Sequence, residues 1–94
     1  MYLHLGQGTV VPFKSIIGVF DLDNASSSHI TRAFLSAAEK AGNVVNAAED
    51  IPKSFVLCEE DGRTTVYLSQ LASATLLRRS ESGAIDQAPD EEKV

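Results

Sequence analysis

The dipeptide Asp61-Gly62 is the feature that most constrains how this chain can fold. It separates two runs of β-forming residues, Ser-Phe-Val-Leu-Cys at 54–58 and Thr-Thr-Val-Tyr-Leu at 64–68. Asp-Gly between such runs predicts a hairpin with a type I′ turn, because both turn residues need positive φ and this pair tolerates it. A turn of this kind fixes the register of the two strands. The expected cross-strand pairs are Glu60 with Arg63, Leu57 with Val66, and Phe55 with Leu68.

Further short strands are expected at residues 2–5, 9–11, 15–20 and 44–45. The first of them places Leu3 and Leu5 on one face, which predicts a half-buried strand. Pro12 cannot donate a ladder hydrogen bond, so it marks the edge or the end of the second. The run at 15–20 carries apolar residues on both faces, as is typical of a central strand.

Two helices are expected, at about 28–41 and about 72–79. In the first, apolar residues recur at helical spacing, at positions 30, 34, 37, 38 and 41. The serines at 26–28 are candidate N-caps, and Gly42 stands where a left-handed C-cap belongs. In the second, Leu76 and Leu77 are expected to face inward. The order strands, helix, strands, short helix predicts an α+β domain with a small, mostly antiparallel sheet.

Charge divides the chain into two parts. Residues 80–94 hold five acids and one base, whereas residues 1–79 hold eight acids and seven bases, so most of the net charge of -5 lies in the tail. We therefore expect a single domain over 1–79, followed by an acidic disordered tail over 80–94. A domain of this size buries little of its surface and is marginal alone, which makes oligomerisation one route to further burial.

The chain is expected to act in the cytoplasm. It has no apolar run of 18 residues, so no membrane span is expected, and its first residues lack the basic and apolar regions of a secretory signal. Cys58 is the single cysteine, so one chain cannot form an internal disulfide, and a reducing compartment fits.

Patterns that superficially resemble ligand sites fail on spacing. Gly6 and Gly8 lack the third glycine and the following helix of a dinucleotide-binding fingerprint. Asp21 and Asp23 open like a calcium loop, but Arg32 stands where the loop needs a bidentate glutamate. The more economical interpretation of the two aspartates is an acidic turn between a strand and a helix.

Catalytic and metal-binding groups show no motif either. His4, His29 and Cys58 lie far apart, without the close pair that most zinc sites use. We interpret the histidines as surface or core residues and Cys58 as a small buried hydrophobe. No enzyme activity, cofactor, metal or small-molecule substrate is therefore expected.

Lysines at strand starts are the more interesting polar candidates. Lys14 and Lys53 each begin a strand beside a proline-containing loop, and binding residues often lie on such loops. From these residues alone, a solvated lysine remains the commoner interpretation. Arg78 and Arg79 end the second helix, where the helix dipole explains two cations without a ligand, with a phosphate contact as the alternative.

Taken together in order and spacing, several segments resemble one known family. The chain is similar to the Rem family of bacterial extracellular-matrix (biofilm) regulators over about residues 2–79, and to RemB-like rather than RemA-like members. The segments that carry this resemblance are Leu3-His4-Leu5-Gly6-x-Gly8, Val10-Val11, Ile16-Ile17-x-Val19, the helix from Ile30 to Gly42, Pro52-Lys53-Ser54-x-Val56, and Tyr67-Leu68-Ser69 with Thr75-Leu76-x-x-Arg79.

The resemblance implies a non-enzymatic transcription regulator that assembles into closed rings and binds double-stranded DNA through basic residues around the ring. One basic position of the family aligns with Ser15, next to Lys14. We therefore expect Lys14 and Lys53 to be the DNA-binding residues, with Arg32 and Arg79 as weaker candidates. The family's arginine-rich stretch before the hairpin reads Asp50-Ile51-Pro52-Lys53 here, so only Lys53 keeps its charge. The alternative is an oligomeric protein-interaction module that has lost DNA binding and acts with a partner regulator.

Overall fold

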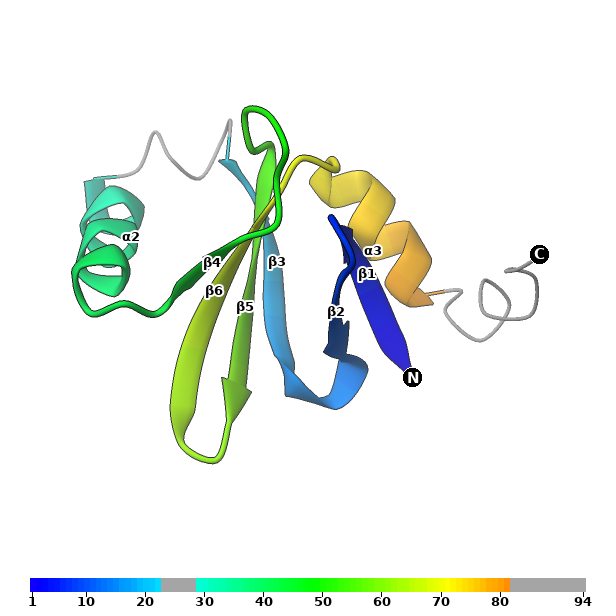
Figure 1. Ribbon diagram of the computed structural model, residues 1–94, viewed down its shortest axis with the longest axis horizontal. Helices are drawn as coiled ribbons and strands as arrows, with labels where there is room; N and C mark the ends of the chain where they lie inside the picture. Colours follow the sequence, from blue (N-terminus) through cyan, green and yellow to red (C-terminus); the bar gives the residue numbers. More distant parts are fainter. Residues whose placement is uncertain (23–28, 82–94) are drawn as a thin grey trace.

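A computed structural model describes residues 1–22 and 29–81 of the 94-residue chain (Figure 1). The elements follow one another as β1 (Tyr2–Gly6), β2 (Thr9–Pro12), the 3-10 turn η1 (Phe13–Ser15), β3 (Ile16–Asp21), α2 (His29–Lys40), β4 (Val44–Asn46), β5 (Ser54–Glu60), β6 (Arg63–Ser69) and α3 (Ser73–Glu81). Strands and helices occur in the expected order, so the prediction of a small α+β fold is confirmed. Within the described ranges, neither helix is long and apolar enough to cross a membrane.

The main sheet has four strands in the order β3-β5-β6-β4. β5 pairs antiparallel with β3 and β6, whereas β4 pairs parallel with β6. β1 and β2 form a separate antiparallel hairpin. The predicted hairpin register is confirmed at all three expected pairs, and the turn residues Asp61 and Gly62 have φ of 53° and 79°.

The strand at 15–20 is not central, as its apolar pattern predicted, but forms the edge strand β3. Its two apolar faces have different partners. Ile16 and Val19 pack against the core, whereas the ring of Phe20 stacks on Phe55 at 4.8 Å on the other face. A register shift between Ile16 and Gly18 leaves Ile17 56% exposed.

The core lies between one face of the main sheet and a cover made of the β1–β2 hairpin and α3 (Figure 1). Its buried side chains are Leu3, Leu5, Val11, Ala47, Val56, Cys58 and Leu76. Two buried serines tie the main sheet to the β1–β2 hairpin and to the segment that leads into α3. The Ser69 hydroxyl donates to the Leu5 carbonyl at 2.7 Å and accepts from the Leu71 N–H at 3.1 Å. The Ser54 hydroxyl donates to the Leu71 carbonyl at 2.7 Å.

The helix α2 begins and ends within one residue of the expected range. Gly42 has φ of 78°, and its N–H donates to the Glu39 carbonyl while the Asn43 N–H donates to the Ala38 carbonyl. This pair of bonds is the Schellman motif, so the predicted glycine cap is confirmed. The serines predicted as N-caps lie outside the described residues.

The apolar stripe of α2 is not buried within the subunit, which differs from the sequence expectation. No residue of α2 is buried, although the helix packs against β6 (Figure 1). Ile30 is 78% exposed and Phe34 is 41% exposed. Helical periodicity predicts that a stripe shares one face, but it does not specify whether the same chain covers that face.

The second helix, α3, runs two residues past its predicted end, so Ser80 and Glu81 are helical rather than part of a disordered tail. The Ser80 hydroxyl donates to the Leu77 carbonyl within this last turn. Leu76 is fully buried, as expected, but Leu77 is 52% exposed. Neighbouring helical residues point about 100° apart, so a single helix face cannot bury both. Residues 82–94 of the predicted tail lie outside the described residues.

Candidate nucleic-acid interface

The two lysines singled out by sequence lie at opposite ends of the main sheet. Lys14 belongs to η1, which leads into the start of β3, and Lys53 stands directly before β5. Because β3 and β5 are antiparallel, Ile16 pairs with Cys58 whereas Asp21 pairs with Ser54. Five residues of strand therefore separate the two sites, about 17 Å at 3.4 Å per residue. One subunit does not join these lysines into a single basic patch.

The backbone of Lys53 is held on both sides, while its side chain is exposed. Its N–H donates to the Ser69 carbonyl at 2.8 Å, and its carbonyl accepts from the Leu22 N–H at 3.0 Å. These bonds fix the origin of the side chain at the end of the sheet where β5 starts and β6 ends. Lys53 can therefore present a cation from a defined position without ordering the backbone on binding.

Two acids precede Lys53 on a loop that the protein holds in place. The N–H groups of Glu49 and Asp50 both donate to the side-chain oxygen of Gln70, at 2.6 and 3.2 Å. Glu49 and Asp50 are exposed. The loop before β5 therefore carries more negative than positive charge, which weakens its attraction for a phosphate.

Lys14 is likewise exposed on a fixed piece of backbone. The neighbouring Phe13 N–H donates to the Met1 carbonyl at 2.9 Å, and the Ser15 hydroxyl donates to the Pro12 carbonyl at 2.8 Å. The start of the chain thus holds η1 against β1. Unlike Lys53, Lys14 has no acidic residue among its five nearest neighbours on either side in the chain.

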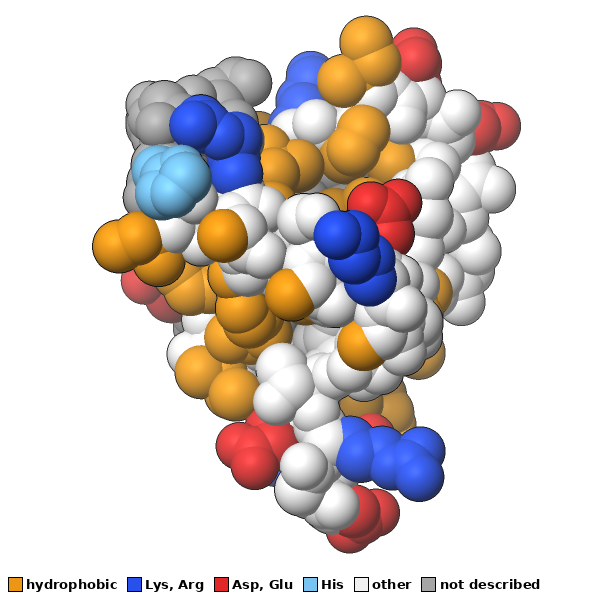
Figure 2. Space-filling model, turned by 90° about the vertical axis from the view of Figure 1, so that its left-hand side faces the viewer, with side chains coloured by type: hydrophobic (Ala, Val, Ile, Leu, Met, Phe, Trp, Pro, Cys, Tyr) orange, Lys and Arg blue, Asp and Glu red, His pale blue; other side chains and the backbone are white. Residues whose placement is uncertain are grey.

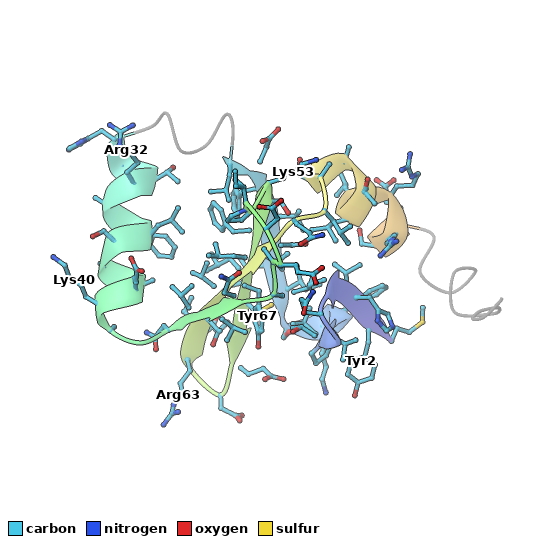
Figure 3. All side chains as sticks on the ribbon, turned by 45° about the horizontal axis from the view of Figure 1, so that its top comes forward. Tyr2, Arg32, Lys40, Lys53, Arg63 and Tyr67 are labelled. Atoms are coloured by element: carbon cyan, nitrogen blue, oxygen red, sulfur yellow. The ribbon has the colours of Figure 1, made fainter. Side chains whose placement is uncertain are left out.

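The weaker candidates lie on the two helices. Arg32 is exposed on α2, and Arg79 is exposed in the last turn of α3. Figure 3 shows Arg32 and Lys53 toward the same end of the subunit, but on separate elements. None of the four predicted DNA-binding residues shares an element with another. The subunit therefore presents dispersed cations rather than a cationic groove.

Other chemistry is sparse in the part of the chain that the structure describes. No three side chains from His, Cys, Asp and Glu come together there as a metal site would require. A hollow open to solvent at the tip of the β5–β6 hairpin is lined by Glu60, Asp61, Arg63 and Thr65. Cys58 is buried and His4 is exposed, in keeping with their sequence interpretation.

Burial governs the titration of Cys58 and Tyr67. It raises the pKa of the Cys58 thiol above its usual 9.0, against a smaller lowering by a hydrogen bond with Ser15, and it raises the pKa of Tyr67 above its usual 10.0. The folded state therefore favours the protonated, neutral form of both groups. Their contribution to stability is therefore complete below about pH 9 and is lost as the pH rises through the raised values.

We expect the free energy of unfolding to fall above pH 9 after a plateau between pH 7 and 9. Urea denaturation followed by circular dichroism at each pH measures it. Tyr67→Phe, which removes one titrating group while keeping the ring, should show a shallower alkaline fall. A fall of equal slope in both proteins would show that Tyr67 does not contribute.

Sequence reasoning missed two exposed apolar surfaces, because it assigned their residues to the core. The first, called the α2 surface, consists of Ile30 and Phe34, which are four residues apart on one side of the helix. The second, called the β3 surface, consists of Ile17 and Phe20, which is 38% exposed, on the open edge of the sheet. Figure 2 looks onto the side of α2 and shows hydrophobic side chains gathered there among charged ones. The sequence signal was a surplus of apolar residues over what so small a core can bury.

Comparison with known proteins assigns this arrangement to a class. The family described as "RemA-like: Extracellular matrix regulatory protein A-like" matches residues 2–79, which span nearly the whole described fold. The chain therefore belongs to the RemA-like family of extracellular matrix regulatory proteins. The chain is also similar to a curated protein, Extracellular matrix regulatory protein B of Bacillus subtilis (strain 168). The two are 36% identical over 81 residues, which cover 86% of this chain and 91% of the relative. The predicted Rem-family, RemB-like resemblance is confirmed.

Proposed function

We propose that this protein is a ring-forming, non-enzymatic regulator of extracellular-matrix (biofilm) gene expression that binds the backbone of double-stranded DNA. The family match over residues 2–79 carries the proposal, together with the name of the relative as an extracellular matrix regulatory protein. In this proposal the protein acts in the cytoplasm, without a cofactor or a small-molecule substrate. Lys14 and Lys53 contact phosphates, and Arg32 and Arg79 add weaker contacts.

Assembly is what makes such binding effective. DNA affinity rises with the number of phosphates that are neutralised, and one subunit offers only separated cations. A ring repeats each cation at every subunit, so contacts that are weak singly act together on one duplex. The two exposed apolar surfaces support self-association, because contiguous apolar surface on a small domain favours burial against a partner.

A second function is favoured by the charge around Lys53. Glu49 and Asp50 precede this lysine on the same loop, and the chain as a whole has a net charge of -5. Both features oppose DNA binding. The alternative is therefore an assembled protein-interaction module that acts with a partner regulator and does not contact DNA itself.

Light scattering coupled to size exclusion tests the assembly that both functions share. We expect a homo-oligomer of several subunits at micromolar concentration in moderate salt. A protein that elutes only with the mass of one 10.1 kDa chain under these conditions would contradict the ring.

A further inference from the structure

We propose that the outer face of the β1–β2 hairpin binds single-stranded nucleic acid, with unpaired bases stacked on Tyr2 and His4 beside the cation of Lys14. This site goes beyond the proposed duplex contact and shares only Lys14 with it. A phosphate contact reads the backbone alone, whereas the hairpin face offers aromatic rings to the bases themselves.

The register of β1 and β2 defines this face. Each β1 residue of the set is the cross-strand partner of a β2 residue, and such partners project from the same side of an antiparallel pair. The alternate pair, Leu3 with Val11, is buried in the core. The opposite side therefore points away from the main sheet (Figure 1). We call it the hairpin face, and its residues are Tyr2, His4, Val10 and Pro12.

Two aromatic rings stand on the hairpin face from a backbone that is fixed beneath them. Tyr2 is 55% exposed and His4 is exposed, while Leu3 and Leu5 anchor the same strand in the core. Residues two apart on a strand have Cα atoms about 7 Å apart, so both rings are available to one ligand. Figure 3 shows Tyr2 directed away from the rest of the subunit. Exposed aromatic side chains on strands are a common platform for unpaired bases.

Charge around the hairpin face favours a polyanion. Residues 1–20 contain no Asp or Glu, although the whole chain has a net charge of -5. The hydrogen bond from the Phe13 N–H to the Met1 carbonyl, at 2.9 Å, holds η1 beside the start of β1, and the next residue, Lys14, is exposed. Aromatic rings next to a cation are the combination with which proteins hold single strands.

Stacking on these rings requires bases that are not paired. In a duplex each base lies between its neighbours, and only base edges are presented in the grooves. Unpaired bases can be splayed out and laid on an aromatic side chain, and every base has a face for this contact. We therefore expect a single strand, with little preference for its sequence.

The test measures binding of two labelled oligonucleotides of about 12 nucleotides, an oligodeoxythymidylate and an oligouridylate, by fluorescence anisotropy at low and moderate salt. Tyr2→Ala removes one ring, and Tyr2→Phe keeps the ring without its hydroxyl. Phe34→Ala is the matched control, because it removes an exposed ring from α2, on the opposite side of the main sheet (Figure 1). Circular dichroism and light scattering establish that each variant keeps its fold and its assembly.

We expect both oligonucleotides to bind, and Tyr2→Ala to bind them at least about fivefold more weakly, the lower limit for losing one stacked base. The salt slope of this variant should equal that of the natural protein, because the ring neutralises no phosphate. Tyr2→Phe and Phe34→Ala should bind as the natural protein does. Dependence on Tyr2 supports the proposal with either sugar, and the tighter oligonucleotide identifies DNA or RNA as the source.

Tyrosine fluorescence gives a second readout of the same contact. The chain has two tyrosines and no tryptophan, so Tyr67→Phe leaves Tyr2 as the single tyrosine. Either oligonucleotide should quench its emission when a base stacks on the ring. Binding without quenching, or equal losses of affinity in Tyr2→Ala and Phe34→Ala, overturns the stacking contact.

The remaining outcomes separate this inference from the proposed function. No binding of either oligonucleotide at low salt overturns the inference and leaves the hairpin face to a protein partner. Loss of assembly in Tyr2→Ala also overturns it, by making the face a contact between copies. Binding of a duplex without binding of the oligonucleotides removes this inference alone. Binding of the oligonucleotides without binding of a duplex supports it and removes the proposed duplex contact.

Discussion

Leu5→Ala should destabilise the domain by about 2–5 kcal/mol, the usual cost of removing a fully buried leucine side chain. Leu5 is fully buried between the β1–β2 hairpin and the main sheet, and its carbonyl accepts the hydrogen bond from Ser69. Globular domains gain about 0.05–0.15 kcal/mol of stability per residue, so about 80 folded residues hold about 4–12 kcal/mol. The single substitution removes a large share of that total.

Urea denaturation at pH 7 measures this loss, and His4→Ala is its matched control. His4 is the preceding residue on β1 and points to the exposed face, so its truncation should change the free energy of unfolding by less than about 0.5 kcal/mol. Similar small effects at both positions would mean that the hairpin does not pack on the sheet as described.

The double variant Lys14→Ala, Lys53→Ala should weaken DNA binding at least about tenfold and flatten its salt dependence. Each phosphate contact that is lost lowers the log–log salt slope by about 0.9, and in an assembly the loss recurs at every subunit. Since lysine contacts to phosphate carry no sequence information, the weakening should be equal for unrelated duplexes. Fluorescence anisotropy with two duplexes of different sequence measures both effects.

The control for this variant is Arg63→Ala, Lys93→Ala, which removes the same number of positive charges at positions outside the proposed DNA contacts. It should retain most of the affinity. Equal weakening in both double variants would show that net charge matters and that Lys14 and Lys53 have no special role. Unchanged binding in the lysine variant would refute their assignment as DNA-binding residues.

Local structure could be predicted from the sequence wherever a backbone position needs a conformation that few residue types tolerate. The turn at Asp61-Gly62 and the cap at Gly42 both need positive φ, and both were placed correctly with their consequences for register and helix end. The alternation that buries Leu3 was equally readable, since strand side chains switch faces at every residue.

The sequence could not show which chain buries an apolar residue. The strand at 15–20 and the helix at 28–41 have enough apolar residues for burial, and the sequence assigned them to the core of their own subunit. Instead Ile17 and Ile30 are more than half exposed. Apolar periodicity indicates that one face of an element is stabilised when it is removed from water. A neighbouring molecule can bury that face as well as the same chain can.

The sequence also could not show which of the candidate DNA-binding residues lie close together in space. Lys14 and Lys53 look equivalent in sequence, because each begins a strand after a proline-containing loop. The two strands are antiparallel neighbours, so equivalent positions in them point to opposite ends of the sheet. The charge around Lys53 was clearer from sequence, since Asp50 is close to it along the chain.

The salt dependence of DNA binding by the natural protein tests the central claim most directly. Anisotropy titrations of a labelled duplex at several salt concentrations give the log–log slope, at about -0.9 for each neutralised phosphate. The account predicts saturable binding with a slope steeper than about -4, which is more than the four proposed cations of one subunit can supply. Absence of binding even at low salt would contradict the DNA function and favour the interaction module. A slope of about -4 or shallower would contradict the cooperation of subunits on one duplex.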